Sequence, residues 1–306
     1  MHLENERLEN KMNLRGLKGS IVALVTPFDE NGDPDFNQLG DLIDWHIANG
    51  TDGIVTLGTT GESATMLQEE DDEVCRFTVE RVAGRIPVIA GSGSNCTQAM
   101  LERSLSFEAM GVDGLLLISP YYNKTNDEGM YMHFKTIADA VHIPCLIYNV
   151  PGRTGCNISE SVVARLSRHP MIYGIKEASG DMSYAMKIAR YLSDDFVMFS
   201  GNDDITIPIL SIGGSGVISV LANIMPHETH EMVMNYLNGH TAEAAASQLR
   251  YLELINNLFL EVNPIPVKTA LGLMNKCGDN LRMPLYNMSY GAKDALSATM
   301  RKAGLI

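Results

Sequence analysis

One lysine stands out among the residues that could do chemistry. Lys176 follows Tyr173-Gly174-Ile175 directly, in a short apolar run that is typical of a strand buried on both faces. A lysine held there loses hydration, its pKa falls, and the neutral amine can attack a carbonyl carbon to form a Schiff base. The other interpretation pairs Lys176 with its neighbour Glu177 at a strand end, and the residues alone leave both open.

Several polar residues follow other apolar runs and could act with this lysine. Tyr148 and Tyr122 carry phenols that can relay protons when a hydroxyl such as that of Thr59 links them. Arg153 has a planar fork suited to a carboxylate, and the amides of the Gly58–Gly61 turn could hold a second small anion. Taken singly, each tyrosine is more simply a packing residue and the arginine a surface residue.

A metal centre is not expected. His227 and His230 lie three residues apart at a predicted helix start, but no carboxylate cluster or third histidine completes a site. A solvated helix explains them better. The sequence also lacks the GxSxG and HExxH motifs of serine hydrolases and zinc proteases.

The elements that must position these residues are about eight short apolar runs separated by stretches of helical period. The runs span residues 20–28, 53–58, 87–93, 114–120, 144–150, 173–178, 196–202 and 216–222. Such an alternation predicts an α/β fold, specifically a (β/α)8 TIM barrel, whose working groups follow the carboxyl ends of the strands. A doubly wound sheet is disfavoured, because GSGSNC at 91–96 lacks the third glycine of a dinucleotide fingerprint and no GxxxxGK[ST] loop occurs.

The predicted organisation is a polar N-terminal extension over 1–18, a catalytic barrel over 19–240 and a C-terminal helical domain over 241–306. Amphipathic stretches at 241–260 and 291–306 indicate the C-terminal helical domain. Between them, NPIPVK at 263–268 begins another helix with prolines at its start. The uncharged segment Ile205–Pro226 is long enough to cross a bilayer. Its glycines, serines and proline favour a buried strand with flanking loops instead.

Composition limits the partners and the compartment. The 306 residues carry 23 Lys+Arg against 37 Asp+Glu, a formal charge of −14 that disfavours general binding to nucleic acids or anionic membranes. Five cysteines, odd in number and without a CxxC, imply neither a disulfide framework nor a zinc knuckle, so a reducing cytoplasm is expected. The first residues resemble neither a secretory signal nor a transit peptide.

Several motifs together resemble one family. They are GTTGESAT, SPYYN, YNVPGRTG, GIKEASG, FSGND, GGSGVISV and NPIPVK, in that order from about Gly19 to the C-terminus. The pattern is similar to the pyruvate-dependent class I aldolases of the dihydrodipicolinate synthase and N-acetylneuraminate lyase superfamily, most of all to its synthase branch. Spread over nearly the whole chain, the motifs are far more specific together than any one of them is alone.

The resemblance implies a lyase that joins pyruvate to L-aspartate 4-semialdehyde, giving 4-hydroxy-tetrahydrodipicolinate at the entry to diaminopimelate and lysine biosynthesis. It implies that Lys176 forms the imine with pyruvate, and that Tyr148, Thr59 and Tyr122 relay protons. The residue matching Tyr122 reaches in from a neighbouring subunit in this family, so a homodimer or homotetramer is expected. No metal or organic cofactor is expected, because the imine is the electron sink.

The remaining substrate contacts follow from the same resemblance. Thr60 is expected to bind the pyruvate carboxylate, Gly201 and Ile218 to supply backbone contacts near the lysine, and Arg153 to grip the carboxylate of the semialdehyde. Neuraminate lyases typically lack that arginine. The alternatives are another pyruvate-dependent aldolase acting on N-acetylneuraminate or a keto-sugar acid, and a non-catalytic barrel with a binding or regulatory role.

A possible effector site departs from the family pattern. Many bacterial synthases bind L-lysine at the dimer interface, and Ser63, Ala64, Asn95 and Tyr121 match that site. The positions where sensitive enzymes carry two histidines and a glutamate hold Gln68, Asp71 and Ala99 here. We therefore expect weak or absent inhibition by lysine, although Asp71 could still meet the side-chain ammonium of the ligand.

Overall fold

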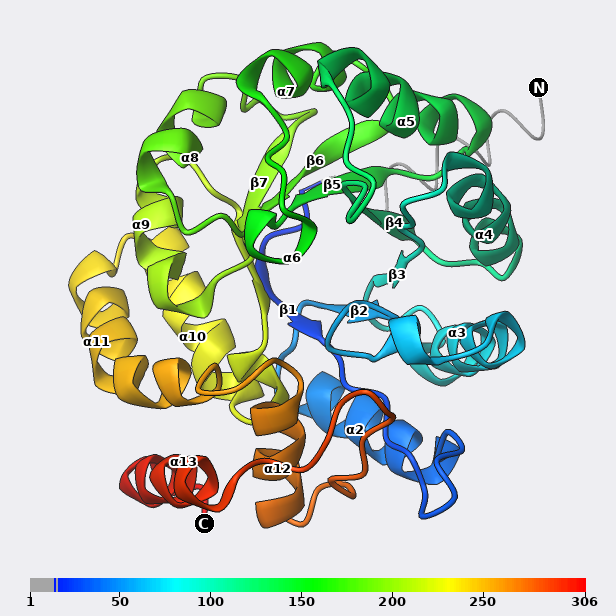
Figure 1. Ribbon diagram of the computed structural model, residues 1–306. Helices are drawn as coiled ribbons and strands as arrows, with labels where there is room; N and C mark the ends of the chain where they lie inside the picture. The colour runs from blue at the N-terminus through cyan, green and yellow to red at the C-terminus, as the bar shows by residue number, and fades with distance from the viewer. Residues whose placement is uncertain (1–13, 15) are drawn as a thin grey trace. The chain divides into compact units, whose positions relative to one another are not determined.

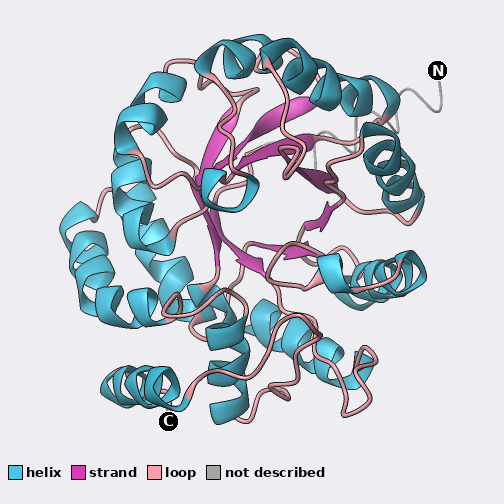
Figure 2. Ribbon diagram, viewed as in Figure 1, coloured by secondary structure: helices cyan, strands magenta, loops and turns pink. Residues whose placement is uncertain are grey.

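The eight predicted strands are present and form a closed parallel barrel. The computed structural model describes residue 14 and residues 16–306, so most of the predicted extension over 1–18 lies outside the described residues. The strands follow one another in chain order around the barrel and alternate with helices (Figures 1 and 2). They are β1 Gly19–Ala23, β2 Gly53–Thr56, β3 Val88–Gly91, β4 Gly114–Ile118, β5 Cys145–Asn149, β6 Ile172–Glu177, β7 Val197–Ser200 and β8 Gly216–Ser219. The predicted (β/α)8 fold is confirmed.

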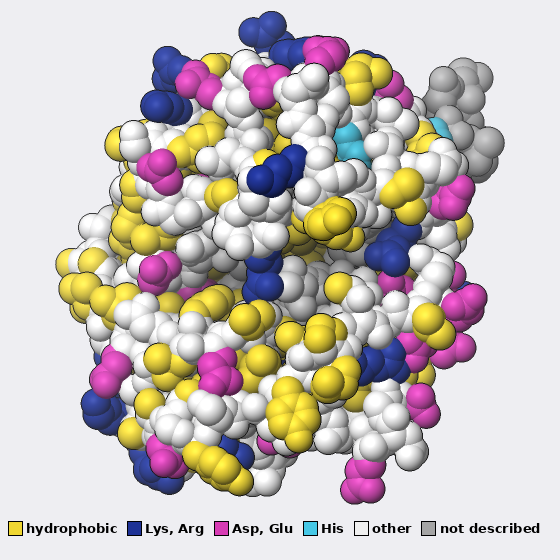
Figure 3. Space-filling view, viewed as in Figure 1, with side chains coloured by type: hydrophobic (Ala, Val, Ile, Leu, Met, Phe, Trp, Pro, Cys, Tyr) yellow, Lys and Arg dark blue, Asp and Glu magenta, His cyan; other side chains and the backbone are white. Residues whose placement is uncertain are grey.

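The chain divides into two compact units, of which the first comprises Pro87–Ile218 and the described residues before Gly19. Its strands pair in parallel from β3 through to β8. Its helices are α4 Thr97–Ala109, α5 Asp127–Ala140, α6 Pro151–Thr154, α7 Glu160–Leu166, α8 Met182–Ala189 and α9 Thr206–Ser211, with the 3-10 turn η2 Asp203–Ile205. Acidic and basic side chains are interspersed over α5 and α7 (Figure 3), where Arg165 Nη1 lies 2.6 Å from Glu128 Oε2.

The second unit comprises Gly19–Ile86 and Ser219–Ile306, so both ends of the described chain contribute to it. It holds β1, β2, α2 Phe36–Ala48, η1 Ser63–Thr65, α3 Gln68–Val82, η3 Leu221–Asn223, α10 Pro226–Leu237, α11 Thr241–Asn257, α12 Ile265–Leu273 and α13 Tyr290–Lys302. Helix α11 packs against α10 and α13, and α12 packs against α13 (Figure 1). The predicted C-terminal helices are therefore present, while the domain boundary at residue 240 stays a prediction.

Local signals account for the helix ends. The Asp35 side chain accepts a hydrogen bond from the Gln38 N–H at the start of α2, and Gly50 follows its end with φ 81°, a conformation that suits glycine. Helix α3 begins with Glu69, Glu70 and Asp71 in its first turn, where the helix dipole favours negative charge. Both helices lie between the predicted apolar runs, where stretches of helical period are expected from the sequence.

Two segments differ from their simple sequence patterns. The apolar run 20–28 leaves the sheet at Ala23, because the Val25 N–H donates to the Asn223 side chain at 3.1 Å and not to a neighbouring strand. The uncharged segment 205–226 contains α9, β8 and η3, so a short helix precedes its buried strand. Across the described part of the chain, none of the helices is long and apolar enough to cross a membrane.

Candidate active site

Lys176 lies in the middle of a row of buried strand residues. It is the fifth residue of β6, beside Tyr148 on β5 and Phe199 on β7. Only 6% of its surface is exposed, and its Nζ lies 4.5 Å from the centre of the Tyr148 ring. The amine is thus desolvated and held against a phenol.

Burial, more than the neighbouring charges, favours a neutral amine at Lys176. Burial lowers the pKa of Lys176 to about 8, the negative charge of Asp203 opposes that shift, and the positive charge of Arg153 adds to it. The alternative pairing with Glu177 is not seen. The Glu177 carboxylate accepts hydrogen bonds from Asn149 Nδ2 at 2.8 Å and from the Ser179 N–H at 2.7 Å.

A pH dependence follows from this pKa. Since only the neutral amine attacks a carbonyl, kcat/KM for pyruvate should rise about tenfold per pH unit below the pKa and level off above about 8. Initial rates in overlapping buffers between about pH 6 and pH 10 measure the profile. A rate that still rises steeply up to pH 10, as the ordinary lysine pKa of 10.5 requires, would contradict the assignment of Lys176.

Tyr148 presents a phenol that remains protonated. Burial raises its pKa to about 12, an effect that Arg153 opposes and Glu177 reinforces. The residue is 8% exposed and pairs in register with Lys176. A buried, protonated phenol beside an amine can donate a proton to an oxygen that develops negative charge at the attacked carbon.

Arg153 lies just beyond the carboxyl end of β5. Pro151 begins the single-turn helix α6 and Gly155 ends it with φ 69°, which presents the exposed Arg153 on a short rigid turn. Its positive charge lowers the pKa of both Lys176 and Tyr148, so Arg153 acts on the same cluster. Its guanidinium can receive a carboxylate in a bidentate manner.

Gly201 allows the lysine side chain to pass. A β-carbon at this position would lie 2.6 Å from Ala178 Cβ and 3.0 Å from Lys176 Cε. Ile218, the other predicted backbone contact, is fully buried in β8. The absence of a side chain at residue 201 thus keeps the lysine in its present path.

Gly201→Ala should reduce turnover while the protein still folds. The flexible lysine can move away from the added methyl group, but its amine is then displaced, and we expect kcat/KM to fall about tenfold or more. Steady-state kinetics and a melting curve measure the two effects. Gly291→Ala is the control, because nothing lies within 4 Å of the added atom. Equal activity of the two variants would show that the close contact at Gly201 is unimportant.

The loop after β4 presents two tyrosines to solvent. Tyr122 is 91% exposed and has φ 66°, an uncommon conformation for a bulky residue, whereas Tyr121 is 38% exposed. The adjacent Asn123 donates its amide to the Asn95 carbonyl at 2.9 Å. The structure therefore does not bury the Tyr122 phenol within its own chain.

Thr59 and Thr60 lie in the second unit, on the turn that follows β2. The turn is closed by hydrogen bonds from the Gly61 N–H to the Gly58 carbonyl at 3.0 Å and from the Glu62 N–H to the Thr59 carbonyl at 3.1 Å. Thr60 is buried, and its hydroxyl oxygen accepts a hydrogen bond from Asn263 Nδ2 at 2.9 Å. This turn and the Lys176 cluster are the two parts of the predicted site.

The predicted effector residues fall in both units. Ser63, Ala64, Gln68 and Asp71 lie on η1 and the first turn of α3, whereas Asn95 and Tyr121 follow β3 and β4. Asp71 is fully buried and accepts a hydrogen bond from the Ser63 hydroxyl at 3.1 Å. Gln68 is exposed and donates to Asp72. The buried Asp71 carboxylate is thus already engaged by a hydroxyl.

The histidine pair does not form a metal site. His230 Nδ1 lies 2.8 Å from Asp52 Oδ2, and His227 is exposed to solvent. Among the described residues, no group of three or more His, Cys, Asp or Glu side chains is arranged to hold a metal ion.

Several residues of the two units have contacts that the sequence motifs do not indicate. Asp203 acts on Lys176 through its charge, and Asn149 holds Glu177 away from the lysine. Lys268 and Asn263 belong to NPIPVK, which the sequence marks as a helix start and as one of the family motifs but without a role for either residue. One sequence feature points to a buried role for Lys268: it is a charged residue in an otherwise uncharged helix start.

The fold and the buried lysine define a class of protein. A closed (β/α)8 barrel with a desolvated lysine at a strand end is suited to Schiff-base chemistry on carbonyl substrates. Residues 16–303 match the model of the dihydrodipicolinate synthetase family. The chain belongs to this family.

Individual relatives are similar over almost their whole length. The 4-hydroxy-tetrahydrodipicolinate synthase of Clostridium tetani is 52% identical over 290 residues, which are 94% of this chain and 98% of that protein. The dihydrodipicolinate synthase structure from Aquifex aeolicus has a TM-score of 0.92 and 42% identity, over 94% of this chain and 98% of that one. The structure of the chloride-inhibited dihydrodipicolinate synthase from Acinetobacter baumannii, complexed with pyruvate, has a TM-score of 0.93 and 39% identity. The match covers 95% of this chain and 100% of that one.

Proposed function

We propose that this chain is a 4-hydroxy-tetrahydrodipicolinate synthase that condenses pyruvate with L-aspartate 4-semialdehyde. The observation that carries the proposal is the buried Lys176, whose pKa of about 8 leaves about a tenth of the amine neutral at pH 7. The names of relatives that are about half identical support the same activity, as does the pyruvate in the Acinetobacter structure.

The first half of the reaction activates pyruvate. The neutral Lys176 amine attacks the ketone carbon, and the carbinolamine oxygen leaves as water once it is protonated. Tyr148 is suited to deliver that proton, because its pKa of about 12 keeps the phenol protonated. Loss of a methyl proton from the imine then gives an enamine, whose electrons come from the broken C–H bond.

The second half joins the two substrates. The enamine carbon attacks the aldehyde, and the aldehyde oxygen takes up a proton to become a hydroxyl. The amine of the semialdehyde then displaces Lys176 from the imine, closing the ring and releasing the lysine. Over the cycle one water is lost. Arg153 receives the carboxylate of the semialdehyde, Thr60 binds that of pyruvate, and Gly201 and Ile218 contribute backbone contacts near the lysine.

The proton relay of this proposal comprises Tyr148, Thr59 and Tyr122. Tyr122 completes the relay of a second copy, which its exposure and left-handed backbone support. The active form is accordingly a homodimer, usually paired into a homotetramer. The enzyme works in the cytoplasm without an added metal or organic cofactor, because the imine withdraws the electrons.

Borohydride reduction tests the imine directly. With pyruvate present, reduction should add one pyruvyl group to the peptide that contains Lys176, and peptide mass spectrometry locates it. Lys268 is an internal control, since burial lowers its pKa as well but Glu62 holds it. An adduct on Lys268, or none on Lys176, refutes the mechanism. An adduct with turnover of N-acetylneuraminate and not of the semialdehyde would favour the keto-sugar alternative.

Lysine should inhibit this enzyme weakly. Ala99 supplies no charge for the α-amino group of the ligand, and Asp71 is buried and bonded to Ser63. We expect an inhibition constant above about 1 mM in a coupled assay, corresponding to less than about 4 kcal/mol of binding free energy. A submillimolar constant would show that Ser63, Ala64, Gln68, Asp71, Asn95 and Tyr121 still form an effector site.

A further inference from the structure

The turn that carries Thr59 and Thr60 is strained at both ends. Leu57 and Glu62 have φ 56° and φ 57°, left-handed conformations that residues with side chains rarely adopt. Such conformations are unfavourable for residues with a side chain, and they persist only where the surrounding structure holds them. The turn therefore needs an external restraint to keep its hydroxyls in one orientation.

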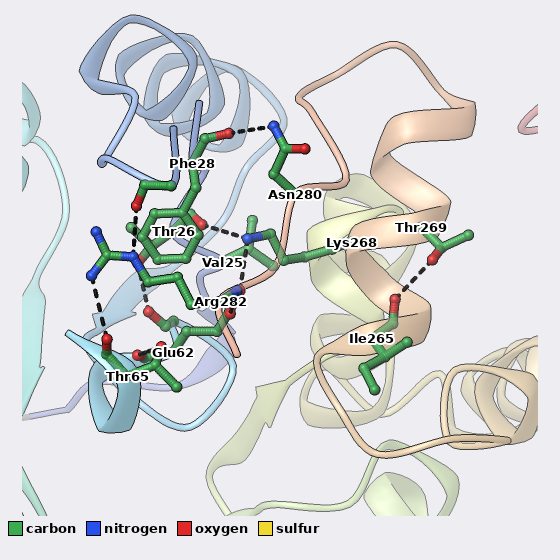
Figure 4. A network of polar contacts seen from close by, with 12 residues as sticks. Val25, Thr26, Phe28, Glu62, Thr65, Ile265, Lys268, Thr269, Asn280 and Arg282 are labelled. Atoms are coloured by element: carbon green, nitrogen blue, oxygen red, sulfur yellow. Dashed lines mark hydrogen bonds and ion pairs between the residues drawn. The ribbon is translucent and has the colours of Figure 1, made fainter. Parts of the chain in front are cut away.

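A buried ion pair provides that restraint. Lys268 reaches from α12, and its Nζ donates to Glu62 Oε1 at 2.6 Å and to the Thr26 carbonyl at 2.9 Å (Figure 4). The Lys268 and Glu62 side chains are both fully buried. The other Glu62 oxygen accepts from the backbone N–H of Arg282 at 3.1 Å, so the carboxylate is held on two sides.

Neighbouring contacts hold the rest of the turn. The Thr26 hydroxyl donates to the Gly61 carbonyl at 2.7 Å, which joins the same β1 loop to the turn. The Phe28 ring lies 4.3 Å from Lys268 Nζ and 4.5 Å from Arg282 Cζ, measured to the ring centre. Both cations thus lie against the same aromatic ring.

Stability alone gives little reason for this arrangement. Moving two charges into a protein interior carries a large desolvation penalty, and a buried ion pair can often be replaced by apolar residues without loss of stability. A pair that carries that penalty is better explained by the geometry it imposes. Here the imposed geometry is that of the strained turn.

The same C-terminal segment also orients the Thr60 hydroxyl. Asn263, five residues before Lys268, donates its amide to Thr60 Oγ1 at 2.9 Å, and both residues are buried. A hydroxyl that accepts this bond keeps its own proton for another partner. A carboxylate oxygen is such a partner.

We propose that Lys268, Glu62 and Asn263 are positioning residues for substrate binding: the ion pair fixes the strained turn, and Asn263 directs the Thr60 hydroxyl to the pyruvate carboxylate. This role rests on the proposed function. It assigns the segment from Asn263 to Lys268 a part in pyruvate affinity that a C-terminal structural appendage would not have.

The test is a neutral double variant, Glu62→Gln with Lys268→Met, which removes both charges at similar volume. We expect the melting temperature to change by only a few degrees, while KM for pyruvate rises about tenfold, the effect of losing a well-placed hydrogen bond to a charged group. KM for the semialdehyde should change less than about twofold. A merely structural role would reduce kcat through loss of active enzyme and leave both KM values as they were.

Two further variants complete the experiment. Asn263→Ala leaves the ion pair intact and should also raise KM for pyruvate selectively, so it decides the matter if the double variant does not fold. Glu253→Gln with Lys302→Met removes an exposed ion pair on α11 and α13 and should change neither KM. Wild-type KM for pyruvate in the double variant, or in Asn263→Ala, overturns the inference. Failure of the wild-type protein to form the Lys176 adduct refutes the proposed function instead.

Discussion

Replacing Lys176 with alanine is expected to reduce kcat/KM for pyruvate by about a thousandfold or more, because it removes the nucleophile that forms the covalent intermediate. The buried position has no second amine in register, since its strand neighbours are Tyr148 and Phe199. A coupled assay with both substrates measures the loss. Borohydride treatment with pyruvate should then leave the variant unmodified.

The matched control is Lys187→Ala on the exposed side of α8, the helix that follows β6. It removes a lysine of ordinary solvation and should retain wild-type turnover and the pyruvyl adduct. Both variants should melt like the wild-type protein, since alanine at residue 176 removes a desolvated cation from the interior. If Lys176→Ala retained turnover within tenfold of wild type, an imine at this residue could not be the route.

Replacing Arg153 with alanine should have the second-largest effect, on the other substrate. Loss of a bidentate partner for a carboxylate is expected to lower kcat/KM for L-aspartate 4-semialdehyde about 100-fold. The pyruvyl adduct on Lys176 should still form. Because the positive charge of Arg153 lowers the pKa of Lys176, the pH profile for pyruvate should also move to higher pH in the variant.

Arg168→Ala, which removes an exposed arginine beyond α7, controls for the loss of one positive charge. This variant should change neither kcat/KM for the semialdehyde nor the pH profile for pyruvate. An Arg153→Ala variant with undiminished semialdehyde turnover would remove the residue from the site. Gain of activity toward a keto-sugar acid in the same variant would instead support its role in choosing the acceptor.

The barrel and its lysine could be predicted because their signals are local. Each strand is an apolar run that adjacent residues reveal, and Lys176 interrupts such a run, so its burial follows from the strand itself. The position of Arg153 is equally local, since Pro151 and Gly155 delimit its turn. The end of β1 could not be predicted from adjacent residues. There the Val25 N–H donates to the side chain of Asn223, which is 198 residues away, and not to a neighbouring strand.

The charge partners could not be predicted from neighbouring positions. The obvious partner of Lys176 in sequence is Glu177, yet Asn149 and Ser179 hold that carboxylate, and Asp203 on a different strand end acts on the lysine. Glu62 lies in a recognisable turn motif, but nothing around it indicates Lys268. Such pairings depend on which strand ends, turns and helices lie next to one another in the folded protein, and neighbouring residues in the sequence do not reveal this.

The Glu62–Lys268 pair also has a consequence for biosynthesis. The two residues are separated by 206 positions, and the unit that contains them is built from the early and late parts of the chain. At about 5–20 residues per second, Glu62 precedes its partner on the ribosome by roughly 10–40 s. During that interval the carboxylate must remain hydrated, so the Thr59–Thr60 turn acquires its final geometry only after translation has passed α12.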